Sequence, residues 1–127
     1  MIVNSIGKTR WAIAGGHIPL SSTGPEPELT SHDKLCLLNT NDREAQVEIT
    51  ILYADHEPVG PYPLTVKARR ARHVRFNDLI NPEAMPLDTD YASLITSNLP
   101  IVVQFSRLNS GQAENAVLGA MAFPADD

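Results

Sequence analysis

The residues best suited to binding chemistry are concentrated in one short basic run. Five of the ten Lys and Arg residues of this 127-residue chain lie between Lys67 and Arg75, although the formal net charge of the whole protein is −5. Any contact with phosphate or with an acidic partner must therefore come from this local patch. The run contains no aromatic residue before Phe76, so contact with a nucleic acid here would be made to its backbone and not by base stacking.

A second set of polar side chains lies in segments whose alternate residues are apolar. Arg, Gln, His and Ser supply directional hydrogen bonds, and an aromatic such as Trp11 supplies a flat apolar wall, a composition typical of a site for a sugar-like ligand. The candidate ligand-binding residues are Trp11, His73, Arg75, Gln104, Ser106 and Arg107. The alternative is an ordinary solvated sheet face.

The candidates for contact with an acidic partner are the remaining cations of the basic run, Lys67, Arg69, Arg70 and Arg72. Here the alternative is an edge strand whose charges protect it against aggregation.

Signatures of catalysis, cofactor binding and metal binding are absent from the sequence. There is no Gly-rich phosphate loop and no serine in a nucleophile elbow. The four histidines lack the short spacing of metal ligands, and Asp88 and Asp90 lack the further ligands of a calcium loop. The single cysteine, Cys36, excludes an intrachain disulfide and lies in an apolar run where a buried thiol is expected. We therefore expect a protein without enzymatic activity, cofactor or metal.

The elements that must position these residues are strands. Residues 45–53 show the clearest alternation, with Val47, Ile49, Ile51 and Tyr53 on one face and polar residues on the other. In the segment after residue 90, a turn at Asn98-Leu99-Pro100 predicts a hairpin. Prolines exclude a helix from the loop at 17–30 and recur in a second loop at 81–90. The expected strands are 9–14, 33–39, 45–53, 62–66, 67–75, 91–97, 101–108 and 116–123.

About eight short strands separated by turn signals predict an all-β fold, a single-domain antiparallel β-sandwich spanning residues 1–127. Residues 1–8 and 124–127 are expected to be loosely ordered, as termini usually are. The sequence shows no signal peptide and no run of about 20 apolar residues. We therefore expect a soluble, cytoplasmic protein that is not inserted into a membrane.

Eight stretches of the chain together form a recognisable pattern. They are Trp11-Ala12-Ile13-Ala14, Gly24-Pro25-Glu26-Pro27, Val47-Glu48-Ile49-Thr50-Ile51, Glu57-Pro58-Val59-Gly60-Pro61-Tyr62, Ala68-Arg69-Arg70, His73-Val74-Arg75-Phe76-Asn77-Asp78-Leu79, Pro100-Ile101-Val102-Val103-Gln104 and Gln112-Ala113-Glu114-Asn115-Ala116. In these stretches the chain resembles the sensory rhodopsin transducer family, the small soluble partner of a microbial photoreceptor. The resemblance extends from Trp11 to about Phe123 and covers nearly the whole chain.

The resemblance implies a non-catalytic β-sandwich protomer assembled as a cytoplasmic homotetramer, which relays photoreceptor state through contact with the cytoplasmic side of a sensory rhodopsin. Two alternatives stay open: a sensor of a small, carbohydrate-like molecule, and a DNA-interacting regulator acting through weak contacts of the basic strand at 67–75. One departure from the family pattern is Phe105, where a polar residue is expected. The alternation around Gln104 places Phe105 in the core, where this change would not affect a ligand.

Overall fold

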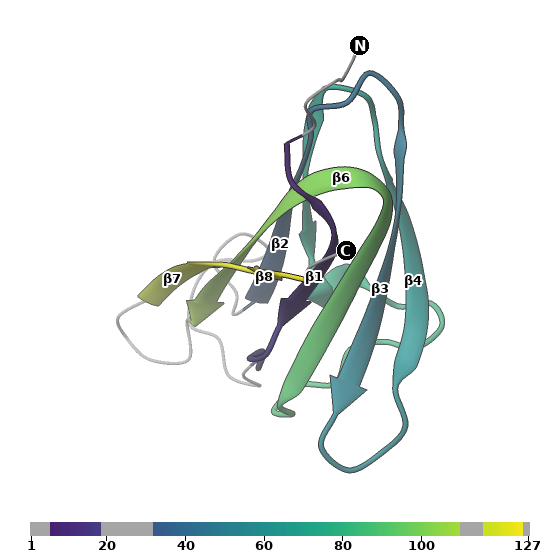
Figure 1. Ribbon diagram of the computed structural model, residues 1–127. Helices are drawn as coiled ribbons and strands as arrows, with labels where there is room; N and C mark the ends of the chain where they lie inside the picture. Colours follow the sequence, from purple (N-terminus) through teal and green to yellow (C-terminus); the bar gives the residue numbers. More distant parts are fainter. Residues whose placement is uncertain (1–5, 19–31, 110–115, 126–127) are drawn as a thin grey trace.

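Alternating apolar residues build two antiparallel sheets that pack into a β-sandwich (Figure 1). The computed structural model describes residues 6–18, 32–109 and 116–125, so most of the predicted loop at 17–30 lies outside the described residues. The elements are β1 (Lys8–Ile13), β2 (His32–Asn39), β3 (Ala45–Tyr53), β4 (Val59–Val66), β5 (Arg70–Arg75), the 3₁₀ turn η1 (Phe76–Asp78), β6 (Tyr91–Asn109), β7 (Ala116–Met121) and β8 (Phe123–Pro124). The predicted all-β sandwich is confirmed.

The long strand β6 belongs to both sheets. The first sheet has the strand order β4-β3-β6-β1-β8. The second sheet consists of β5, β2, β6 and β7, in which β2 pairs with both β5 and β6, and β7 pairs with β6. All of these pairings are antiparallel.

The core lies between the inward faces of the two sheets. In β3 the alternate residues Val47, Ile49 and Ile51 are at most 1% exposed, as the period of two requires. In the second sheet Leu35 and Leu37 of β2 are equally buried. An aromatic cluster joins the sheets. The centroid of the Phe76 ring lies 5.3 Å from the Tyr91 ring centroid and 6.2 Å from the Phe105 ring centroid. Phe105 is buried at 7% exposure, which confirms its predicted place in the core.

The segment predicted as a hairpin is in fact one continuous strand, so this prediction was wrong. β6 runs with β3 as far as Ser97 and with β2 from Val102 onward, and Figure 1 shows it as a single strand bent into an arch. Its pairing with β1 shifts at the arch, because Lys8 lies opposite Ile101 whereas Arg10 lies opposite Thr96. The extra β6 residues at this bulge turn the strand from one sheet into the other.

Polar side chains form hydrogen bonds with backbone groups at this corner. Asn98 and Pro100, which take part in these bonds, also gave the misleading turn signal. Asn98 Oδ1 accepts a hydrogen bond from the backbone N–H of Gln46 (2.8 Å), and Asn41 Nδ2 donates to the Pro100 carbonyl (2.8 Å). Asn and Pro are typical of turns because Asn hydrogen-bonds to nearby backbone and Pro restricts φ, but here the contacts are made to residues more than 50 positions away. Here they bend the chain without reversing it.

The edge strands β4 and β5 lie on the same side of the sandwich. Among the described residues, β4 pairs only with β3 and β5 only with β2; β4 contains Pro61 and Pro63, in line with the edge position that Pro63 predicts. The predicted strand at 67–75 is shorter than expected. Residues 67–69 form the turn between the sheets, with Arg69 at a left-handed φ of 54°, and β5 begins at Arg70.

Candidate functional site

Four of the six predicted ligand-binding residues lie on the outer face of the second sheet. His73 and Gln104 flank Cys36 in one cross-strand row, since Cys36 pairs with both of them. In the next row on the same face, Lys34 pairs with both Arg75 and Ser106. Neighbouring strands are about 4.8 Å apart, so the side chains of β5 and β6 in each row are separated by roughly twice that distance, with a β2 side chain between them.

The sequence reasoning missed the two central members of this outer face. Lys34 and Cys36 alternate with the buried Leu35 and Leu37, and that alternation was the available signal. Cys36 is a free cysteine of intermediate exposure, not the buried thiol expected from its apolar neighbours. The face combines hydrogen-bonding groups, positive charge and a thiol.

The other two predicted ligand-binding residues lie elsewhere. Trp11 is 4% exposed and belongs to the core. Its indole Nε1 donates to the Lys8 carbonyl (3.0 Å) and to the Ile101 carbonyl (3.1 Å), which fixes β1 to the corner of β6. Arg107 pairs across the strands with the buried Asp33 and lies on the inward side of the second sheet. Neither residue joins the outer face that carries His73 and Gln104.

Asp33 is the centre of a buried polar cluster that sequence reasoning did not single out. Its side chain is 0% exposed. Oδ1 accepts a hydrogen bond from Arg107 Nε (3.0 Å), and Oδ2 accepts from the Tyr91 hydroxyl (2.6 Å) and from the His17 amide (2.9 Å). Because Tyr91 and Arg107 stand near opposite ends of β6, one carboxylate holds both ends of the arched strand. The available signal was an acidic residue at an inward position of an alternating strand.

The surroundings of Tyr91 in this cluster change its pKa. Burial raises the pKa of Tyr91 far above its ordinary value, and the neighbouring Asp33 carboxylate adds to the effect, while the Arg107 guanidinium partly opposes it. His17 extends the cluster to the surface, where Nδ1 lies 2.8 Å from Asp90 Oδ1. The Tyr91 hydroxyl therefore stays protonated at neutral pH and donates to Asp33, and the cluster holds the two ends of β6 together.

The basic run forms an exposed rim at the edge of the second sheet. Lys67, Arg69, Arg70 and Arg72 are all exposed, and within the described residues no ion pair involves any of them. Arg72 donates to the Thr65 carbonyl (2.7 Å). Arg70 donates to the Arg69 carbonyl (3.1 Å). These contacts hold the guanidinium groups against the backbone while most of their donors stay open to solvent.

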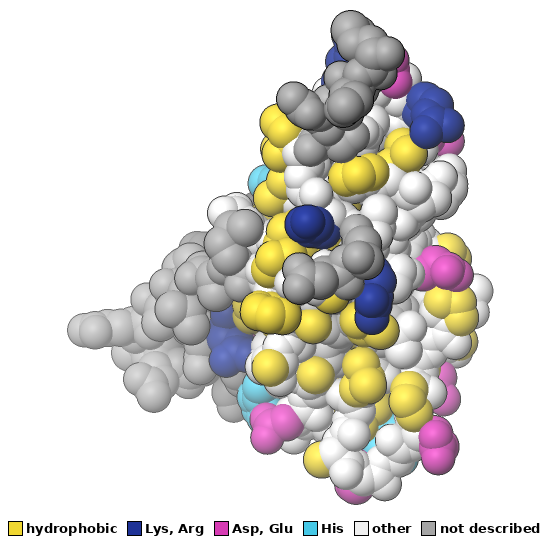
Figure 2. Space-filling view, viewed as in Figure 1, with side chains coloured by type: hydrophobic (Ala, Val, Ile, Leu, Met, Phe, Trp, Pro, Cys, Tyr) yellow, Lys and Arg dark blue, Asp and Glu magenta, His cyan; other side chains and the backbone are white. Residues whose placement is uncertain are grey.

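The outer face of the first sheet is apolar over part of its surface. Figure 2 shows apolar side chains gathered on the face of the molecule formed by β1, β3, β6 and β8. Phe123 of β8 is 72% exposed and Leu52 of β3 is 38% exposed. Between them, Ala12 and Leu94 pair across β1 and β6 and are partly exposed. Exposed apolar surface of this kind commonly marks an interaction site.

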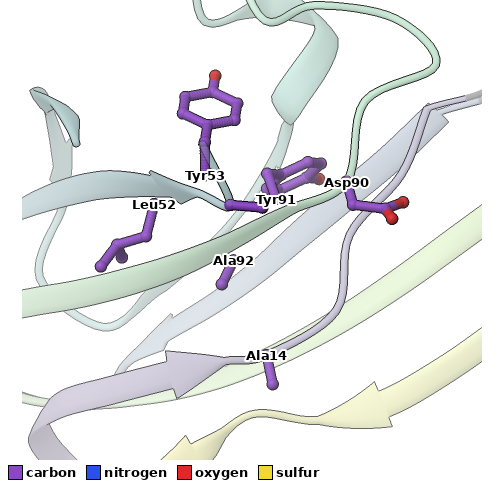
Figure 3. A pocket seen from close by; sticks show the side chains of 7 residues that line it. Ala14, Leu52, Tyr53, Asp90, Tyr91 and Ala92 are labelled. Atoms are coloured by element: carbon purple, nitrogen blue, oxygen red, sulfur yellow. The ribbon is translucent and has the colours of Figure 1, made fainter. Parts of the chain in front are cut away.

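A small pocket of about 280 Å³ lies beside this apolar face. In Figure 3, Leu52 and the Asp90 carboxylate lie at opposite ends of the group of lining side chains. The lining residues are Ala14, Leu52, Tyr53, Ala54, Asp90, Tyr91 and Ala92. None of the predicted ligand-binding residues is among them, so the pocket and the polar outer face of the second sheet are separate features.

Comparison with known proteins identifies the family. The family model described as Anabaena sensory rhodopsin transducer matches residues 6–124. The chain belongs to the sensory rhodopsin transducer family. A solved structure of the Anabaena sensory rhodopsin transducer is 61% identical in sequence, with a TM-score of 0.74, and the match covers 81% of this chain and 99% of that one.

A more distant relative of this transducer-family protein has the same fold. The crystal structure of Thermotoga maritima 1070 is 29% identical, with a TM-score of 0.84, and the match covers 94% of this chain and 97% of the other. No curated protein sequence matches the chain.

The described part of this family member contains no preformed metal site. Within residues 6–18, 32–109 and 116–125, no group of three or more His, Cys, Asp or Glu residues is placed to hold a metal ion. The same residues contain no helix of sufficient length and apolarity to cross a bilayer. The sheet face with His73 and Gln104 adjoins the basic rim at β5, where Arg70 and Arg72 project to the inward side of the strand and His73 to the outer side.

Proposed function

We propose that this protein is a signalling transducer that relays the state of a sensory rhodopsin through direct protein contact. The observation that carries the proposal is the family match over residues 6–124, together with 61% identity to the Anabaena sensory rhodopsin transducer. A relay of this kind requires that the transducer binds two photoreceptor states with different affinity, because equal affinity shifts neither population.

The contact surface in this proposal combines the basic rim with the polar outer face of the second sheet. The rim supplies Lys67, Arg69, Arg70 and Arg72, and the face supplies His73, Arg75, Gln104 and Ser106. Exposed cations of one sign favour the approach of an acidic partner and select against basic ones. The hydrogen-bonding side chains of the adjacent face then determine orientation.

We also propose that the protein acts in the cytoplasm as a homotetramer. The exposed Phe123 and Leu52 on the first sheet support assembly, since subunit interfaces bury apolar side chains of this kind. Size-exclusion chromatography with light scattering tests it: we expect a mass near four times 13.9 kDa, and a monomer across micromolar concentrations would contradict the assembly. A Phe123→Ser exchange is expected to weaken the tetramer, whereas Ile80→Ser, at an equally exposed apolar residue (70%) in a loop, serves as the matched control.

The test of the relay is a binding titration against the Anabaena sensory rhodopsin in lipid nanodiscs, in the dark and under continuous illumination. We expect saturable binding whose dissociation constant differs between the two conditions. Exchange of Arg70 and Arg72 for Glu is expected to weaken binding, and Arg43→Glu, which changes an exposed arginine outside the rim, serves as the control. Absence of binding, or identical affinity in dark and light, would refute the relay.

The carbohydrate and DNA alternatives have weaker support. The proposed aromatic wall, Trp11, is buried, and Arg107 is engaged by Asp33, so neither residue joins the other four candidates in one ligand site. The basic rim carries no stacking aromatic, so it lacks the side chains on which nucleic-acid bases stack.

A further inference from the structure

β5 is an edge strand that offers backbone hydrogen bonds and positive charge along the same line. Its six residues pair with β2, in a register from Lys34 opposite Arg75 to Asn39 opposite Arg70. Within the described residues no strand pairs with its other side. Every second residue of such an edge directs its N–H and C=O groups outward, where they can pair with another chain.

The neighbouring edge is closed to this kind of pairing. β4, the edge of the first sheet on the same side, contains Pro61 and Pro63, which have no backbone N–H. β5 contains no proline and no glycine. Of the two edges, β5 is therefore the one that can accept an additional strand.

The basic side chains of β5 point to both faces of the sheet at this edge. Arg70 and Arg72 stand in register with the buried Asn39 and Leu37, so they emerge on the inward side of the strand. His73 stands in register with Cys36 and emerges on the outer side. All three are exposed, and within the described residues none forms an ion pair with a carboxylate.

We propose that β5 receives an extended acidic segment of the partner protein by strand addition. The inference rests on the proposed function and deepens it, because it names the chemistry of the partner segment and how it docks. Main-chain hydrogen bonds to an edge strand supply affinity, and alternate side chains supply specificity. Carboxylates fall opposite Arg70 and Arg72 on one face and opposite His73 on the other, and a small residue falls opposite Ala71. Opposite charges directly across two strands stabilise the pairing.

Strand addition differs from a phosphate contact in one measurable respect. Both weaken as salt rises, but only strand addition requires N–H groups on the ligand. The probe is a fluorescein-labelled peptide of eight residues, Thr-Glu-Val-Asp-Glu-Val-Glu-Thr, blocked at both ends. Two control peptides carry N-methyl groups on alternate residues, one on the odd positions and one on the even positions. In an extended strand only one of these sets faces β5.

The measurement is fluorescence anisotropy with the full chain. We expect the parent peptide to bind, one methylated peptide to bind at least tenfold more weakly, and the other to match the parent within about threefold. Joint exchange of Arg70→Gln and Arg72→Gln is expected to weaken binding at least tenfold, whereas Arg43→Gln, outside β5, leaves it unchanged. Equal binding of both methylated peptides, or no binding of the parent, overturns strand addition. A DNA duplex that binds although the parent peptide does not, and that loses its binding on the Arg70→Gln and Arg72→Gln exchange, shows that the rim serves phosphate contacts instead.

The same reagents separate this inference from the proposed function. If the rhodopsin binds but neither saturating parent peptide nor the Arg70→Gln and Arg72→Gln exchange weakens that binding, strand addition is wrong and the relay stands. If the peptide binds in the expected pattern and the rhodopsin does not bind, the relay is wrong and the acidic-strand site stands.

Discussion

Loss of the charge on Asp33 is expected to destabilise the sandwich strongly, although the residue lies in no proposed contact surface. In the Asp33→Asn variant the side chain keeps its shape. Asn has one acceptor oxygen where Asp has two, so its amide group must face at least one of the donors that now surround the carboxylate: Arg107 Nε, the Tyr91 hydroxyl and the His17 amide. A donor facing a donor leaves both groups buried and unsatisfied.

The size of the effect follows from the geometry. At the Nε–Oδ1 distance of 3.0 Å, the attraction between Asp33 and Arg107 amounts to about 5 kcal/mol at an effective dielectric constant of about 20. Most of that attraction is offset by the desolvation of a fully buried carboxylate. Removal of one partner of a buried pair typically costs about 3–5 kcal/mol. The Arg107 side chain is 28% exposed and stays partly hydrated, so we expect a loss near the lower end, about 3 kcal/mol.

The assay is urea unfolding followed by the fluorescence of Trp11, which is the sole tryptophan and is buried. We expect a lower midpoint with an unchanged slope, since the same surface is exposed on unfolding. Asp42→Asn, at an exposed turn position, is the matched control and should change stability by less than about 0.5 kcal/mol. A loss below about 1 kcal/mol for Asp33→Asn, or additive effects of Asp33→Asn and Tyr91→Phe in a double-mutant cycle, would refute the view that this carboxylate fastens both ends of β6.

Three further predictions concern single positions. Because burial raises the pKa of Tyr91, the folded state holds the hydroxyl proton more tightly than the unfolded chain does. The resulting stabilisation of the folded state is complete below the ordinary tyrosine pKa of about 10 and is lost as pH rises above that value. Tyr91→Phe should therefore show a shallower fall in the free energy of unfolding between about pH 10 and 12 than the parent protein, and parallel curves would contradict this. A Cβ on Gly16 would collide with the Tyr91 ring, whereas one on Gly15 would meet nothing within 4 Å. Gly16→Ala should therefore lower the free energy of unfolding in urea by about 1–3 kcal/mol, and Gly15→Ala should leave it nearly unchanged. Similar losses for the two variants would be inconsistent with the packing. Arg69 adopts a left-handed φ of 54°, so Arg69→Gly should raise the thermal midpoint by relieving about 1 kcal/mol of strain, and a clear fall in the midpoint would argue against that conformation.

Much of the fold could be predicted from local patterns because alternation is a local property. The strand predicted at 45–53 is found as β3 with the same limits, since Val47, Ile49 and Ile51 require a common buried face. The burial of Phe105 followed from the same rule. The outer positions of His73 and Gln104 also followed from it. These residues face outward because their sequence neighbours face the core.

Local patterns failed where the chain changes its partner strand. The Asn98 and Pro100 signals predict a change of direction, but only the pairing of β6 with β3 on one side and with β2 on the other shows that the strand bends into a second sheet. The burial of Trp11 was equally invisible, because one of its two hydrogen-bond acceptors, the Ile101 carbonyl, lies 90 positions away.

The sequence by itself determined which residues alternate, where the positive charge is concentrated and which family the chain resembles. Only the tertiary structure decided which charges are neutralised. Asp33 meets Tyr91 and Arg107 across 58 and 74 positions, and this contact withdraws Arg107 from the predicted surface. Arg70 and Arg72, on an edge strand with a free side among the described residues, keep their charge available. The physical reason is that sheet pairing joins distant segments, so the neighbours of a charged side chain, and with them its role, depend on topology.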